Sequence, residues 1–150
     1  MENKPTSITL QNFTTESGAF YAALNLSFQV FGPELHTAPI VLVNHALTGN
    51  SHVVGENGWW NDLIGEHKTI DTTKYTILGF NVPGNGFDGF IIENYSDFNT
   101  RDIARIFIQG IQLLEIKKLY AIIGGSVGGG IAWEMAEKKK KITQHLIPIA

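Results

Sequence analysis

Apolar and polar residues alternate along residues 8–31, a segment rich in β-branched and aromatic side chains and broken at Ser17-Gly18. This alternation predicts two strands joined as a hairpin, because successive side chains of a strand point to opposite faces. Residues 40–43 and 74–80 are instead mostly apolar runs, as expected for strands buried on both faces. Between them, after a long loop, the pattern predicts a short helix at residues 59–64.

The second half of the chain changes to helical spacing. Thr100 is a suitable N-cap for residues 101–116, where large apolar side chains recur three or four positions apart. An apolar run at 118–125, a helix over 128–140 that ends in lysines, and a further strand at 145–150 complete the pattern. Buried strands that alternate with helices predict an α/β fold built on a mostly parallel sheet. No repeat or Ser/Pro-rich linker divides the 150 residues, so we expect one domain or part of one.

Composition narrows the functional classes. The net charge is −3 and the basic residues are dispersed apart from one short run, so no electrostatic footprint for nucleic acid is present. No apolar stretch approaches the about 20 residues needed to span a bilayer, and the segment MENKPTSITLQNF lacks the features of a signal peptide. The absence of cysteine excludes disulfides, thiolate metal ligands and a cysteine nucleophile. We therefore expect a cytoplasmic protein without a nucleic-acid, membrane or metal partner.

The segment AIIGGSVGGG, residues 121–130, contains the candidate catalytic residue. It lacks the Lys-Ser or Lys-Thr pair of a phosphate-binding loop and the glycine spacing of a dinucleotide-binding turn. One alternative is a tight turn whose glycines only let a strand and a helix pack closely. The other is a G-x-S-x-G turn, residues 124–128, in which small neighbours expose a strained nucleophilic Ser126. The N–H of Val127, at the start of a helix, would then point toward an oxyanion.

A second oxyanion donor is expected in the loop NHALTG, residues 44–49, which follows a buried strand. His45 in this loop precedes the serine, whereas the base of this type of site follows it, so we interpret His45 as structural, fixing the loop. A metal site between His45 and His52 is disfavoured by their spacing.

Several separate segments agree in order with one family. LVNHALTGNSHV, GWWNDLIGEHKTIDTTKYTILGFNVPG, FNTRDIAR and AIIGGSVGGGIAWEMA together resemble the amino-terminal part of the homoserine O-acetyltransferase family of α/β-hydrolase-fold enzymes. The resemblance runs from about residue 17 to the end. It implies an α/β-hydrolase fold in which residues 1–150 are the amino-terminal part of one domain, ending before the last strands and the lid.

The resemblance also implies an activity. Ser126 would take an acetyl group from acetyl-CoA, the acyl-donor substrate, and pass it to L-homoserine in methionine biosynthesis, with no bound cofactor. By position, Ser126 would be the nucleophile, the backbone N–H groups of Val127 and Leu47 would form the oxyanion hole, and Thr48 would line the substrate site. The loop NVPGNGFDGFIIENYSDF departs from the family pattern, which leaves the acyl donor and the acceptor open. The oligomeric state is open too, a homodimer included.

A catalytic serine also needs a general base and an acid that orients this base. After Ser126 the sequence has no aspartate, and its only histidine is His145, within the last predicted strand. Glu134 and Glu137 lie on the helix that begins at the serine, where neither completes a triad by the usual route. The sequence thus predicts that the triad Asp and His lie outside this chain. A serine esterase with the same turn and a catalytically inactive fragment remain the alternatives.

Overall fold

The computed structural model describes residues 3–150, so Met1 and Glu2 of the amino-terminal segment lie outside the described residues. Six strands form the main sheet, in the order β1-β2-β6-β3-β7-β8. Their bounds are β1 Thr6–Thr14, β2 Phe20–Phe31, β3 Ile40–Asn44, β6 Thr76–Phe80, β7 Leu119–Gly125 and β8 Thr143–Ile149. β1 and β2 are antiparallel to their neighbours, whereas β6, β3, β7 and β8 run parallel. The mostly parallel sheet is the one expected from the sequence.

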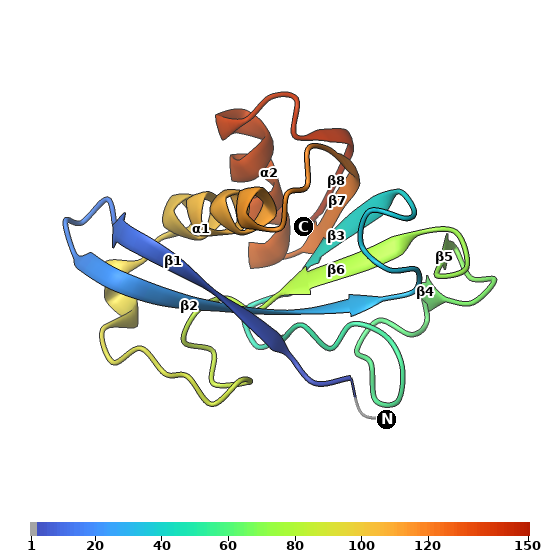
Figure 1. The fold of residues 1–150 in the computed structure, drawn as a ribbon, viewed down its shortest axis with the longest axis horizontal. Helices are drawn as coiled ribbons and strands as arrows, with labels where there is room; N and C mark the ends of the chain where they lie inside the picture. Colours follow the sequence, from blue (N-terminus) through green and yellow to red (C-terminus); the bar gives the residue numbers. More distant parts are fainter. Residues whose placement is uncertain (1–2) are drawn as a thin grey trace.

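The helices lie together on one side of the sheet (Figure 1). They are α1 Thr100–Leu113 and α2 Val127–Lys138, with the short 3₁₀ helix η1 Tyr95–Asp97 before α1. The larger core cluster lies beneath α1 and α2. Gly110 of α1 belongs to this packing, since a Cβ there would meet the Leu26 side chain at 2.5 Å and the Phe80 ring at 3.0 Å. No helix in the described residues is long and apolar enough to cross a membrane.

The opposite face of the sheet is covered by the irregular segment between β3 and β6. Val53, Ile64 and Ile77 are buried there with valines of β3, and Trp60 packs against them. Within this segment β4 Ile64–Gly65 pairs with β5 Ile70–Asp71 in a small parallel sheet.

The short helix predicted at residues 59–64 is wrong. Residues 59–63 form turns, in which the N–H groups of Leu63 and Ile64 both bond to the carbonyl of Trp60. The N–H groups of Trp59 and Trp60 instead bond back to the carbonyls of the preceding loop. The carbonyl of Leu63 accepts from the N–H of Ile70, and Ile64 pairs with Ile70, so the pairing of β4 with β5 ends the helical turn.

The beginning of α1 needs a smaller correction, because the N-cap is Asn99 rather than Thr100. The Asn99 side chain accepts a hydrogen bond from the N–H of Asp102, and the Asp102 carboxylate accepts one from the N–H of Asn99. This reciprocal capping box uses an Asn and an Asp where Ser or Thr and Glu are usual.

Candidate active site

Ser126 stands between the end of β7 and the start of α2, with φ 54° and ψ −125°. Positive φ is unfavourable for a residue with a side chain, and such strain costs about 1–3 kcal/mol when the surroundings enforce it. Here the Ser126 N–H donates to the carbonyl of Ile149 at 2.8 Å, and its carbonyl accepts from the N–H of Gly129 at 2.9 Å. The residue is exposed, and its side chain makes no cap hydrogen bond to the helix.

The glycines around Ser126 divide into two groups. A Cβ on Gly124 would meet the carbonyl of Gly128, and a Cβ on Gly128 would meet the carbonyls of Asn44 and His45. Gly129 similarly lies against carbonyl oxygens at 2.8 and 2.9 Å from an added Cβ. By contrast, an added Cβ at Gly125 or Gly130 would meet no heavy atom within 4 Å. Close packing and an exposed serine are therefore both properties of this turn.

The register of the strands brings the loop that contains Leu47 and the turn that contains Val127 to the same edge of the sheet. Asn44, the last residue of β3, pairs with Gly124 of β7, so the loop after β3 begins beside the turn at Ser126. This is the carboxyl edge of the parallel strands, where α/β sheets usually bind ligands. Leu47 and Thr48 in that loop are both exposed, Leu47 to 80%.

A cavity of about 320 Å³ opens next to these segments. Leu47 lines one part of it and Val127, the residue after Ser126, lines another, whereas Thr48 lies outside its lining. The other lining residues come from the loop after β6, from the segment between η1 and the first turn of α1, and from α2: Val82, Pro83, Gly84, Asn85, Tyr95, Phe98, Asn99, Thr100, Ile103 and Ile131. None of the lining side chains is charged, so the cavity suits a neutral group.

His45 fixes the loop after β3 in place, as the sequence predicts. Its Nδ1 lies 2.6 Å from the carbonyl of Ala46, and its Nε2 accepts a hydrogen bond from the N–H of Val82 at 3.0 Å. The ring is buried, and this burial lowers the pKa of His45 below its ordinary value. The neutral tautomer with a proton on Nδ1 satisfies both bonds. His45 thus connects the loop that contains Leu47 with the cavity-lining Val82.

A buried group of polar side chains supports the same loop from the side of β2. Ser51 donates through its N–H to Asn81 at 2.8 Å and through its hydroxyl to Gln29 at 2.6 Å. The Asn81 amide donates to Ser27 and Ser51, both at 2.9 Å. All four side chains are buried. Because each of them bonds another, the loop after β3, the end of β6 and strand β2 are held in one arrangement.

His145 and His52 both contact groups other than Ser126. His145 pairs with Ala121, while Gly125 pairs with Ile149, so His145 lies about 13 Å back along β8 at about 3.3 Å per residue. Its ring packs against Tyr120 with centroids 4.9 Å apart. His52 bonds to Glu56 and Gln29, away from the turn. Residues 3–150 also contain no cluster of acidic and histidine side chains that could hold a metal ion.

This geometry agrees with a comparison of the sequence with known families. Residues 39–147 match the model of the alpha/beta hydrolase fold, and this range contains β3, the turn at Ser126 and α2. The chain belongs to the α/β-hydrolase fold family. The predicted fold class is thereby confirmed.

Relatives within this family are named for acyl transfer to homoserine. Homoserine O-acetyltransferase of Haloarcula marismortui is 31% identical over 95% of this chain and 40% of the relative. Homoserine O-succinyltransferase of Nitrosomonas europaea is 33% identical over 90% of this chain and 41% of the relative. The chain therefore spans about two fifths of the length of these relatives.

Solved structures show the same fold. The homoserine O-acetyltransferase of Staphylococcus aureus superposes with a TM-score of 0.81 at 31% identity, over 97% of this chain and 46% of that one. Esterase E22 superposes with a TM-score of 0.80 at 23% identity, over 95% of this chain and 46% of that one. The second likeness concerns the fold alone.

The sequence pattern did not predict that residues between 95 and 103 line the cavity. Tyr95, Phe98 and Ile103 line it, although the pattern assigned them only to a loop and a helix. A signal was available in residues 81–86, NVPGNG, because a glycine-rich loop directly after a buried parallel strand belongs to the ligand-binding edge of the sheet. Which later residues close the cavity depends on the path of the chain after this loop.

Proposed function

We propose that this chain forms the nucleophile-bearing part of a homoserine O-acyltransferase that transfers an acetyl group from acetyl-CoA to L-homoserine, a step of methionine biosynthesis. The observation that carries the proposal is the strained, exposed Ser126, next to an uncharged cavity reached by Val127 and Leu47. The similarity to the homoserine acyltransferases supports the substrates.

The reaction proceeds through an acyl-serine. Ser126 Oγ attacks the thioester carbonyl while a base takes its proton, and the N–H groups of Val127 and Leu47 stabilise the oxyanion. The C–S bond then breaks, and coenzyme A leaves as the thiol with that proton. The homoserine hydroxyl next attacks the acyl carbon and gives its proton to the base, which returns it to Ser126 Oγ as the serine ester bond breaks. Thr48, at the exposed end of the loop, contacts the acceptor.

The uncharged lining of the cavity favours acetyl over succinyl. A succinyl group carries a carboxylate, and burying a carboxylate without a basic partner or donors is costly. The twelve lining residues include no Lys, Arg or His. A short neutral acyl group avoids this cost.

The general base and its orienting acid lie outside residues 3–150 in this proposal. His45 and His52 bond other groups, and His145 lies too far back along β8. We expect the purified chain of residues 1–150 to lack steady-state acetyl transfer, and measurable turnover by it would contradict this assignment.

The test uses the complete enzyme that contains residues 1–150 together with its base. Incubation with acetyl-CoA should add one acetyl group to the peptide that contains Ser126, as measured by mass spectrometry, and L-homoserine should remove it. Ser126→Ala should abolish the modification, while Ser7→Ala, which changes an exposed serine of β1 outside the cavity lining, should not. Labelling of another residue, or none, would overturn the proposal.

A serine esterase is the second candidate, favoured by the exposure of Ser126, which lets water reach an acyl-serine. The two functions differ in the acceptor. Release of coenzyme A that requires L-homoserine indicates transfer, whereas cleavage of simple esters at the same rate without homoserine indicates hydrolysis.

A further inference from the structure

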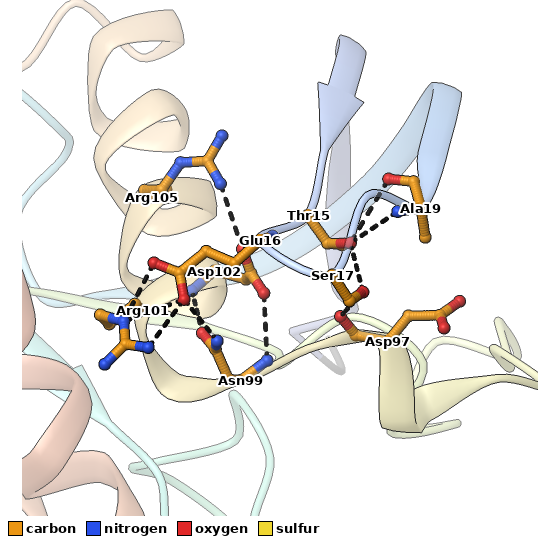
Figure 2. A network of polar contacts seen from close by, with 9 residues as sticks. All are labelled: Thr15, Glu16, Ser17, Ala19, Asp97, Asn99, Arg101, Asp102 and Arg105. Carbon is orange, nitrogen blue, oxygen red and sulfur yellow. Dashed lines mark hydrogen bonds and ion pairs between the residues drawn. The ribbon is translucent and has the colours of Figure 1, made fainter.

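The turn between β1 and β2 is bonded to the beginning of α1, far away in the sequence (Figure 2). The Glu16 carboxylate accepts hydrogen bonds from Arg101 Nε at 2.9 Å and from Asn99 Nδ2 at 2.7 Å, and it pairs with Arg101 Nη2 at 2.8 Å. The backbone N–H of Glu16 donates to Asp102 Oδ1 at 3.0 Å. We call these contacts of Glu16 with Asn99, Arg101 and Asp102 the hairpin clasp.

Contacts of the neighbouring residues extend the clasp to η1. The Ser17 hydroxyl donates to the carbonyl of Asp97 at 2.9 Å, and the Tyr21 hydroxyl donates to the Asp97 carboxylate at 3.2 Å. The ring of Phe98 lies between those of Tyr21 and Phe13, with centroids 5.1 and 6.5 Å away. The segment from Asp97 onward is thus held by both polar and aromatic contacts of the hairpin.

Asp102 fixes the position of the turn through hydrogen bonds to its buried carboxylate. Its side chain is fully buried, and its carboxylate accepts from Glu16 N–H, from Asn99 N–H at 3.2 Å and from Arg105 Nη1 at 3.1 Å. The Arg105 guanidinium also lies 4.7 Å above the centre of the Phe13 ring. A buried carboxylate is tolerated only while its donors stay in place, so displacement of the turn carries a high cost.

The segment that the hairpin clasp holds, residues 97–103, also forms one wall of the cavity. Phe98, Asn99, Thr100 and Ile103 line the cavity together with Val127 and Leu47, and all four lie within the six residues after Asp97. No residue of the hairpin lines the cavity. The hairpin therefore contacts residues that line the cavity, but it does not itself line the space that a substrate would occupy.

We propose that the β1–β2 turn is a positioning element for acyl selectivity: Glu16, through Arg101 and Asn99, fixes the cavity wall at residues 97–103 and thereby limits the length of acyl chain that Ser126 accepts. This inference rests on the proposed acyl-serine chemistry. When the clasp is broken, the wall moves outward, and longer chains fit next to Val127 while short chains lose part of their contacts.

The experiment compares kcat/KM of the complete enzyme for acetyl, butyryl and hexanoyl thioesters. Glu16→Gln and Arg101→Gln should raise the ratio of hexanoyl to acetyl kcat/KM about tenfold, since fit of a few methylene groups in an apolar pocket is worth that much. The exchanged pair Glu16→Arg with Arg101→Glu should recover part of the selectivity. Lys74→Gln, which removes the ion pair of an exposed lysine with Asp71 of β5, is the matched control and should leave the ratio unchanged.

A clasp that only stabilises the fold would lower the melting temperature of the variants but leave the acyl ratio at the wild-type value, and this result would overturn the proposal. Should the Glu16 or Arg101 variants fail to fold, Tyr21→Phe removes the bond to the Asp97 carboxylate, and Ser17→Ala removes the bonds to the Asp97 carbonyl and to the Thr15 hydroxyl. The same change in ratio is expected. Ser126→Ala separates the two proposals. If it retains acyl transfer, the acyl-serine mechanism fails, whereas an unchanged ratio with a Ser126-dependent reaction refutes the clasp alone.

Discussion

The Nε2 atom of His45 accepts a hydrogen bond from the backbone N–H of Val82 at 3.0 Å and joins the loop after β3 to the loop after β6. Both loops line the cavity, through Leu47 and Val82. The neutral imidazole therefore sets the spacing between the expected oxyanion donor and one side of the cavity together with the buried bonds between Ser51 and Asn81.

His45→Ala should lower the free energy of unfolding by about 1–3 kcal/mol, because the buried N–H of Val82 loses its acceptor. The wild type should also lose stability as the pH falls below about 6.5, since the pKa of His45 is lowered in the fold and the unfolded chain binds the proton more tightly. Denaturant titrations of both proteins at several pH values measure this. An equally steep pH dependence in His45→Ala would contradict the role of this histidine.

Ser126→Gly should be more stable than the wild type by about 1 kcal/mol, because glycine adopts a positive φ without the strain of a side chain. Ser126→Ala keeps the Cβ and its strain, so its stability should stay near that of the wild type. Thermal unfolding of the three proteins separates removal of the hydroxyl from removal of the strain. Equal melting temperatures for the glycine and alanine variants would show that the turn stores no strain.

Gly128→Ala should destabilise the fold by more than about 2 kcal/mol, because the added methyl group meets the carbonyls of Asn44 and His45 with no flexible side chain to move aside. Gly130→Ala, two residues further along α2, is the matched control. Its methyl group enters open space, so the better helix propensity of alanine should stabilise the protein by up to about 1 kcal/mol. Similar effects of the two substitutions would contradict the close approach of β3 to the turn.

Acid should weaken the hairpin clasp through Glu16. Hydrogen bonds from Arg101 and Asn99 lower the pKa of Glu16 to about 2, so its contribution to stability is complete above the ordinary pKa of a glutamate and is lost as the pH falls toward 2. Glu16→Gln should flatten the pH dependence of stability in this range. Glu66→Gln, an exposed turn residue, is the control and should keep the wild-type curve. Circular dichroism during acid titration provides the measurement.

Local patterns were sufficient for most elements, for identifiable reasons. Alternation predicted β1 and β2, apolar runs predicted β3, β6 and β7, and the G-x-S-x-G spacing placed Ser126 between a strand and a helix. These features depend on neighbours in the sequence, and strand and helix periods differ enough to be distinguished. The prediction failed at residues 59–64, where the pairing of β4 with β5, rather than local spacing, ends the helical turn.

The sequence by itself determined the fold class and the strand–turn–helix unit around Ser126, because these follow from the period of apolar residues and from a short motif. Only the tertiary structure decided which glycines are needed for packing, where the cavity lies, and that Glu16 meets Arg101 across a separation of 85 residues. Such pairs depend on how the hairpin crosses the helix, which no local pattern encodes. Contacts between distant segments come from register and crossing angles, and these exist only once the sheet and the helices have packed.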